Sequence, residues 1–214
     1  MPVYTAAAPA RASRHLGLDD VHVWRLAYRH DQGRTPLRQM LAAYLDVDPA
    51  DVHFHHGEHG RPALTGHAEL DFNWSHSRDI ALIAIARSLP QLGIDVEASR
   101  PRPRALQLAQ RFFAASEHEQ LVALPAASQQ TAFLRLWTAK EAVLKALGEG
   151  LRYGLHRVTF DLGRTAPIAR SFSGSAAPVH AWQLHAIQDA DCTASLAWRG
   201  DARRVYWFRP TDSI

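Results

Sequence analysis

Apolar residues recur at helical spacing in several parts of the chain. They predict amphipathic helices over residues 35–45, from about 104 to 113, and over 128–147, where two glycines follow. Ser116 and Glu119 have the spacing of a capping box, which predicts the start of a further helix. Of these helices, 128–147 has the strongest pattern.

Other apolar runs predict strands. Residues 92–97 alternate with period two, and residues 79–86 form a buried strand that the polar segment 71–77 is expected to enter as a loop. Prolines predict a surface connector and a boundary near residues 98–104. Short apolar segments in the C-terminal part are expected to form antiparallel strands: RVTFDL, VHAWQLHAI, CTASLAW and RVYWF.

Composition limits the functions that fit this mixed α and β pattern. The chain has 214 residues, with 24 Lys and Arg against 21 Asp and Glu and a net charge of +3. This mild excess favours an anionic small molecule or an acidic protein partner, and we expect no nucleic-acid binding because no basic stripe is interleaved with aromatic residues. The most apolar short run cannot cross a bilayer, and the single Cys192 fits a reducing compartment, so we expect a cytoplasmic protein without a membrane segment.

Two acids in the strand 92–97 are the first candidate for chemistry. Asp95 and Glu97 point to the same face, about 6–7 Å apart along the strand. Two carboxylates this close repel unless something positive lies between them. We therefore expect a cation at this face of the strand.

A second cluster lies on the long helix 128–147. Glu141 and Lys145 are four residues apart and lie together at the edge of its buried face. They either form a surface pair worth roughly 0.2–0.5 kcal/mol, or Glu141 joins the two strand acids in a Mg²⁺ site while Lys145 holds a phosphate. Lys140 falls in the middle of the apolar face, so we expect a buried partner for it, either an acid or the substrate.

These segments resemble the signatures of the Sfp-type 4'-phosphopantetheinyl transferases, in the branch marked by W and KEA. Each signature alone is weak, but five of them occur in the order and spacing of that family. They are HGRP (59–62) for its G-K-P, FNWSHS (72–77), GIDVE (93–97), RFF (111–113) with Glu117, and WTAKEAVLK (137–145).

The resemblance implies an α+β fold of two similar α/β subdomains packed about a pseudo-twofold axis, here residues 1–98 and 99–214. It implies an enzyme that transfers the 4'-phosphopantetheine arm of coenzyme A to a serine of an apo acyl, peptidyl or aryl carrier protein. The reaction requires Mg²⁺ and releases 3',5'-ADP. The nucleophilic serine belongs to the carrier, and one chain supplies every implied site residue, which favours a monomer.

The motif match assigns the metal and the catalytic residues. Three acids would hold the metal: Asp95, Glu97 and Glu141. Lys145 would contact the pyrophosphate, and Lys140, in the same signature, is grouped with the cofactor-binding residues. Asp95 and Lys145 count as catalytic, and the carrier serine would lose its proton to Glu141, to a metal-bound water or to Glu117. Glu117 alternatively only complements the dipole of its helix.

The match also assigns residues to the nucleotide end of coenzyme A. Ser75 and His76 would meet phosphates, although a loop histidine is otherwise an ordinary surface residue. Arg61 replaces the usual lysine of G-K-P and keeps its charge but not its shape. Arg34 and Thr35 match an R-T step near the nucleotide. The basic N-terminal helix of many relatives is short here, which leaves three arginines unplaced: Arg25, Arg29 and Arg38.

Three further points stay open. Residues 104–124 are expected to face the carrier, with Phe112, Phe113 and Leu121 either in the core or in that contact. A Mg²⁺-dependent phosphohydrolase using the same acids, or a catalytically weak or inactive homologue that binds coenzyme A or carrier protein, would also fit. A histidine cluster either binds a metal ion or reflects only the total of 13 histidines: His53, His55, His56 and His59.

Overall fold

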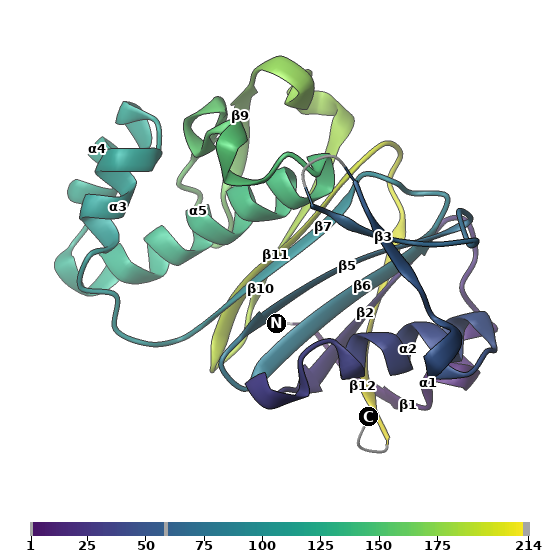
Figure 1. Cartoon of the computed structure of the whole chain (residues 1–214). Helices are drawn as coiled ribbons and strands as arrows, with labels where there is room; N and C mark the ends of the chain where they lie inside the picture. Colours follow the sequence, from purple (N-terminus) through teal and green to yellow (C-terminus); the bar gives the residue numbers. More distant parts are fainter. Residues whose placement is uncertain (1, 58–59, 212–214) are drawn as a thin grey trace.

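The computed structural model describes residues 2–57 and 60–211 of the chain. These residues form five α-helices and twelve strands, so the predicted α+β fold class is confirmed. The strands build two larger sheets and two small hairpins. Each larger sheet carries one long helix on its outer face (Figure 1).

The first sheet contains the N-terminal strands and the last strand of the chain. Its order is β1 (Thr5–Ala7), β12 (Arg204–Pro210), β2 (Asp20–Ala27), β6 (Ile80–Arg87) and β5 (Leu70–Ser77). Its outer face is covered by α1 (Pro9–Ser13) and α2 (Thr35–Leu45), which agrees with the helix predicted at 35–45. The hairpin of β3 (Phe54–His56) and β4 (Pro62–Leu64) follows α2.

The second sheet has the order β10 (Trp182–Gln188), β11 (Cys192–Arg199) and β7 (Leu92–Ala98). The long helix α5 (Ala126–Leu147) lies on its outer face and ends at Gly148, whose φ of 77° is left-handed. Around α5 lie α3 (Ala105–Phe112), α4 (Ala115–Val122) and the hairpin of β8 (Val158–Asp161) and β9 (Ile168–Phe172).

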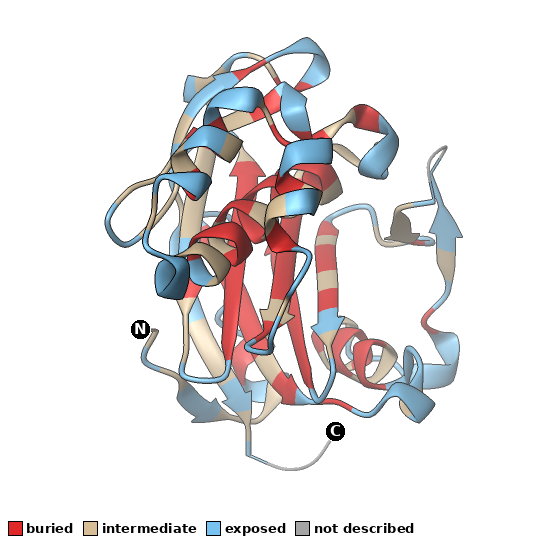
Figure 2. Ribbon diagram, turned by 90° about the vertical axis from the view of Figure 1, so that its left-hand side faces the viewer, coloured by how far each residue is buried: buried red, intermediate tan, exposed pale blue. Residues whose placement is uncertain are grey.

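A common core joins the two sheets. The face of β6 that points away from α2 packs with apolar residues of β7 and β11. Leu82 of β6, Ile94 of β7 and Trp198 of β11 are all 0% exposed in this core. Figure 2 shows these buried strands in the middle of the molecule. Burial on both faces explains why β6 and β11 read as nearly continuous apolar runs.

Gly93 brings the two functional segments of the sequence together. A Cβ atom at this position would overlap the backbone of Ala142 and Ala146 in α5. Only glycine therefore allows the helix to lie so close to β7. The close approach places the helix residues Glu141 and Lys145 above the strand that carries the two acids.

Three local predictions were wrong. Residues 71–77 are not a loop, because they lie within strand β5. The segment RVYWF is a strand, but β12 pairs in parallel with β1 and β2. The predicted Ser116 and Glu119 capping box is also wrong: α4 follows Ala114, whose backbone N–H donates to Glu117 Oε2 at 2.9 Å.

The boundary between 1–98 and 99–214 stays a prediction, as does the pseudo-twofold axis. Strand pairing crosses this boundary three times, because β12 also pairs with β1. β7 pairs with β11 of the C-terminal half, and β12 returns to pair with β2.

No helix within residues 2–57 and 60–211 is both long enough and apolar enough to pass through a lipid bilayer.

Candidate active site

The candidate site lies along the seam where β5 runs beside β7, between α2 and α5 (Figure 1). Both strands are fully described, and no backbone ladder joins them. Polar side chains of β5 replace the ladder and accept hydrogen bonds from the N–H groups of β7. Asn73 accepts from Ile94 at 2.9 Å, Ser75 from Val96 at 3.3 Å and Ser77 from Ala98 at 3.1 Å.

Asp95 is held on one side only. Its Oδ1 accepts from Ser75 Oγ at 2.9 Å and from Lys145 Nζ at 2.7 Å, and the same ammonium lies 2.8 Å from Ser75 Oγ. Asp95 is 6% exposed, and its Oδ2 is buried without a hydrogen-bond partner. The positive group beside Asp95 is therefore Lys145, and one carboxylate oxygen is left for a further ligand.

Glu97 has a comparable environment. Its Oε2 accepts from Ser77 Oγ at 3.1 Å and from the guanidinium of Arg102, which forms an ion pair with it. Burial raises the pKa of Glu97, and Arg102 opposes this effect. Neither Ser77 nor Arg102 was among the predicted site residues. The alternation of polar residues in N-x-S-x-S was the signal for Ser77, whereas Arg102 lies in the connector and had none.

Glu141 is the acid without a partner. Its side chain makes no hydrogen bond or ion pair with any described residue, and its Oε1 is buried and unsatisfied. The alternative of a surface pair with Lys145 is wrong, since Lys145 bonds to Asp95 instead. Burial, and then the charge of Asp95, raise the pKa of Glu141 to about 7.

The donor set fits Mg²⁺, although the three acids are not drawn together. Among the described residues, Asp95, Glu97 and Glu141 do not bring three carboxylate oxygens within 4.8 Å of one another. Binding of one ion by all three acids therefore needs a side-chain rotation. Two buried carboxylate oxygens without partners, Asp95 Oδ2 and Glu141 Oε1, are costly unless a cation or a proton compensates them. Carboxylate oxygens are the ligands that Mg²⁺ takes from proteins.

Asp189, Asp191 and Cys192 do bring three ligand atoms within 4.8 Å of one another, but Arg25 already supplies the positive charge there. Arg25 donates to Asp189 Oδ2 at 2.8 Å, forms an ion pair with Asp191 and lies 3.3 Å from Cys192 Sγ. Tyr4 also donates to Asp189 at 2.9 Å. This cluster links β2 to the turn between β10 and β11, and it engages the Arg25 guanidinium with two acids.

Lys140 and Glu117 form an ion pair inside the core, with both side chains 0% exposed. Lys140 Nζ donates to Glu117 at 2.7 Å and to the carbonyl oxygens of Leu155 at 3.0 Å and Val158 at 2.5 Å. Of the two partners considered for Lys140, the structure contains the acid. Burial lowers the pKa of Lys140 to about 8, and Glu117 opposes this shift.

Glu117 is equally engaged. Its carboxylate also accepts from the backbone N–H of Ala114 at 2.9 Å and of Phe160 at 2.8 Å. The pair therefore ties α4, α5 and β8 together. In this conformation neither side chain has a surface that could meet coenzyme A or the carrier serine.

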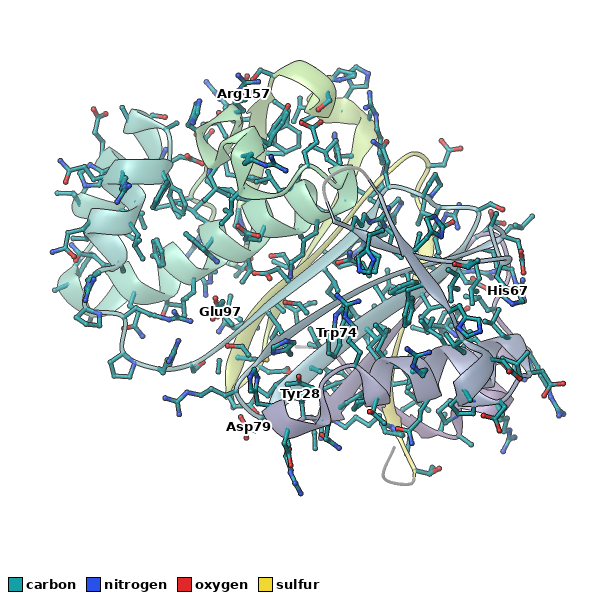
Figure 3. The ribbon with its side chains drawn as sticks, viewed as in Figure 1. Tyr28, His67, Trp74, Asp79, Glu97 and Arg157 are labelled. Carbon is teal, nitrogen blue, oxygen red and sulfur yellow. The ribbon has the colours of Figure 1, made fainter. Side chains whose placement is uncertain are left out.

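His76 lies among aromatic rings on the α2 side of the seam. Its ring centre is 4.5 Å from that of Tyr28 and 5.1 Å from that of Trp74. Burial lowers its pKa, with smaller contributions from His30 and Lys145. Figure 3 shows Tyr28 and Trp74 on this side and Glu97 on the side of α5. Ser75, on the opposite face of β5, is only 6% exposed.

The Arg61 side chain bonds to backbone carbonyl groups next to and within β7. Its guanidinium donates to the carbonyl oxygens of Pro90 and, at 2.8 Å, of Leu92. Its side chain lies against Gly148 at the end of α5. Burial lowers its pKa. Arg61 therefore fixes β4 to the start of β7 in this conformation.

Residues at the start of α2 lie close to the histidine cluster. Arg34 Nη1 lies 3.3 Å from His56 Nε2, and Thr35 is exposed at the first helical position. His53, His55 and His56 do not bring three ligand atoms together among the described residues. His59 lies outside the described residues.

The remaining arginines are held locally. Arg38 donates to the carbonyl of Val52, and Arg29 pairs with the exposed Asp31.

The pKa of Glu141 leads to a stability prediction. An acid whose pKa is about 7 in the folded chain and 4.5 when unfolded takes up a proton on folding between these pH values. The folded state therefore loses stability as pH rises through this window. Glu141→Gln removes the effect. In EDTA the variant should melt about 3 °C or more above the wild type at about pH 8, and at a similar temperature at about pH 5. The same difference in Tm at both pH values would contradict this.

The candidate site combines two acids on strand β7, an acid and a lysine on helix α5 above it, and carboxylate oxygens left for a cation. The family model of the 4'-phosphopantetheinyl transferase superfamily matches residues 91–197. This range contains Asp95, Glu97, Glu141 and Lys145. The chain belongs to this family, as the resemblance in its sequence predicted.

Three relatives illustrate the match. The chain is 39% identical over 176 residues to the 4'-phosphopantetheinyl transferase HetI of Nostoc sp. (strain PCC 7120), covering 80% of this chain and 71% of HetI. It is 31% identical over 168 residues to psf-1 of Bacillus pumilus, covering 77% and 70%. It is 29% identical over 161 residues to Sfp of Bacillus subtilis (strain 168), covering 73% and 70%.

Proposed function

We propose that this protein transfers the 4'-phosphopantetheine arm of coenzyme A to a serine of an apo carrier protein, with Mg²⁺ as cofactor and 3',5'-ADP as the other product. The observation that carries the proposal is the arrangement of Asp95 and Glu97 under Glu141 and Lys145, with buried carboxylate oxygens left unsatisfied. Family membership, with relatives named as 4'-phosphopantetheinyl transferases, supports the same reaction.

The metal would be held by Asp95, Glu97 and Glu141. When bound, Mg²⁺ would neutralise the charge that develops on the leaving 3',5'-ADP. Lys145 lies 2.7 Å from Asp95 and is 28% exposed, so its ammonium can also face a pyrophosphate from the solvent side. A compact ammonium suits a phosphate group whose charge grows during transfer.

Glu141 is the better placed of the two acids considered as the general base. Both of its oxygens are free of hydrogen bonds to described residues, so one can serve the metal while the other accepts the proton of the carrier serine. Glu117 has no exposed surface and already accepts from Lys140 and two backbone N–H groups. Its proposed role is therefore to position α5 through Lys140.

The nucleotide end of coenzyme A is assigned to the α2 side of the seam. His76, Arg34 and Thr35 are partly or fully exposed there and supply the groups for the phosphates, with Ser75 acting through Asp95 and Lys145. The Arg61 guanidinium is already bonded to backbone carbonyls, so its contribution is to hold the hairpin β3–β4.

The acidic carrier is proposed to dock on residues 104–124. Phe112 is 38% exposed and available to it, whereas Phe113 and Leu121 are buried in the core. We place the protein in the cytoplasm as a monomer, because one chain supplies every proposed site residue and buried Cys192 needs no oxidising compartment.

The test is an intact-mass measurement of apo acyl and peptidyl carrier proteins after incubation with this protein, coenzyme A and Mg²⁺. We expect a gain of one phosphopantetheine, no gain in EDTA, and none on a carrier whose acceptor serine is alanine. Release of phosphopantetheine without a carrier would instead indicate a hydrolase. Binding of coenzyme A without transfer to any carrier would indicate an inactive binding homologue.

A further inference from the structure

Glu97 is held in the same way as Asp95, by one serine of β5 and one cation that meet at a single carboxylate oxygen. Ser77 Oγ donates to Glu97 Oε2 at 3.1 Å, and the Arg102 guanidinium donates to the same oxygen. Glu97 Oε1 accepts no hydrogen bond from a described residue, just as Asp95 Oδ2 accepts none. Both acids are thus fixed through one oxygen and leave the other for a ligand.

The hydroxyl of Ser77 has only one possible orientation. Its Oγ accepts the backbone N–H of Ala98 at 3.1 Å. A serine hydroxyl carries a single hydrogen, and that hydrogen is left for Glu97 Oε2. Because the same backbone bond fixes Ser77 to β7, the serine and the acid that it holds move together.

Arg102 lies in the connector between β7 and α3, and hydrogen bonds to Gln130 fix this connector to α5. Gln130 Oε1 accepts from the backbone N–H of Arg102 at 2.8 Å, and Gln130 Nε2 donates to the carbonyl of Arg100 at 2.9 Å. Pro101 and Pro103 restrict the backbone on either side. The Arg102 side chain is 23% exposed, so the connector holds its guanidinium at the site rather than in solvent.

We infer that Ser77 and Arg102 are positioning residues for Glu97: they fix its Oε2 and leave its Oε1 available to the metal. This inference rests on the proposed function. The positive charge of Arg102 alone would repel a nearby metal ion, but loss of orientation has the larger effect, because an unheld Glu97 carboxylate can turn away from the seam. Partners that orient a metal-binding carboxylate typically contribute about 10–100-fold in metal affinity.

The test is calorimetric titration of the full chain with Mg²⁺. Arg102→Gln and Ser77→Ala should each raise the Kd about 10-fold or more, and Ser77→Thr, which keeps the hydroxyl, should restore it. Arg104→Gln removes the same charge from the same connector at an exposed position and should leave the Kd within about twofold. Asn73→Ala is the control for strand stability, because Asn73 holds β7 without touching an acid. It should lower Tm without changing the Kd.

Unchanged or tighter Mg²⁺ binding in both Arg102→Gln and Ser77→Ala would overturn the inference and leave the proposed function intact. The inference is likewise overturned if the wild-type chain transfers phosphopantetheine only with Mg²⁺ and both variants need no more Mg²⁺ than the wild type. A wild-type chain that binds no Mg²⁺ would overturn the metal assignment, and the inference with it.

Discussion

Asp95→Asn is expected to reduce the transfer of phosphopantetheine by about 10³-fold or more. Asp95 has one oxygen bonded to Ser75 and Lys145 and a second, Oδ2, that is buried and unsatisfied. An amide of the same shape keeps the packing but removes the negative charge. Electrostatic stabilisation by a bound metal is worth several kcal/mol in such reactions, and about 4 kcal/mol corresponds to 10³-fold.

The measurement is the initial rate of carrier modification at saturating coenzyme A and Mg²⁺. Asp20→Asn is the matched control: Asp20 is 4% exposed and bonds to the backbone of Gly17 and to Arg204, away from the seam. The control should keep its rate when assayed below its own Tm. If Asp95→Asn transfers as fast as this control, the acid has no part in the reaction.

The regular helices could be predicted from the sequence because their signals are local. The helix predicted at 35–45 matches α2, and the one at 128–147 matches α5 to within two residues at its start. Apolar spacing and the glycine at 148 are sufficient there. The burial of Lys140 followed from the same spacing.

The polar strand β5 could not be predicted in this way. Asn73, Ser75 and Ser77 looked like loop residues because polar side chains are rare inside sheets. Their partners are N–H groups of β7, about twenty residues further along the chain. The alternation of Asn73, Ser75 and Ser77 is compatible with a strand, but it does not identify this distant partner. The parallel return of β12 to the first sheet is non-local in the same sense.

The residue types of the candidate site were proposed from the sequence, but their contacts were not. Asp95, Glu97, Glu141 and Lys145 were selected from motifs, and the close approach at Gly93 explains why two distant motifs belong to one site. Glu117, by contrast, was considered for catalysis because the family carries an acid there. Its burial with Lys140 could be read only from the packed core.

Lys140→Met is expected to lower the free energy of unfolding by about 3–5 kcal/mol, because it leaves Glu117 as a buried carboxylate without its counter-charge. This would lower Tm by roughly 6–20 °C in a chain of this size. The three N–H groups of the ammonium have three acceptors, Glu117 and two carbonyls. Methionine fills a similar volume between Phe113 and Phe160, so the loss would report the charge rather than a cavity.

The double variant Lys140→Met/Glu117→Gln separates the ion pair from the packing. Glutamine removes the buried charge and still offers an oxygen to the backbone N–H groups that Glu117 serves, so we expect at least about half of the lost stability to return. The control is the exposed pair of Arg170 and Asp161, 3.4 Å apart, where Arg170→Met should cost less than about 1 kcal/mol. Urea unfolding of all four proteins gives the comparison. A Lys140→Met variant as stable as Arg170→Met would mean that the pair does not hold α5 in place, and the assignment of Glu117 to structure rather than catalysis would lose its basis.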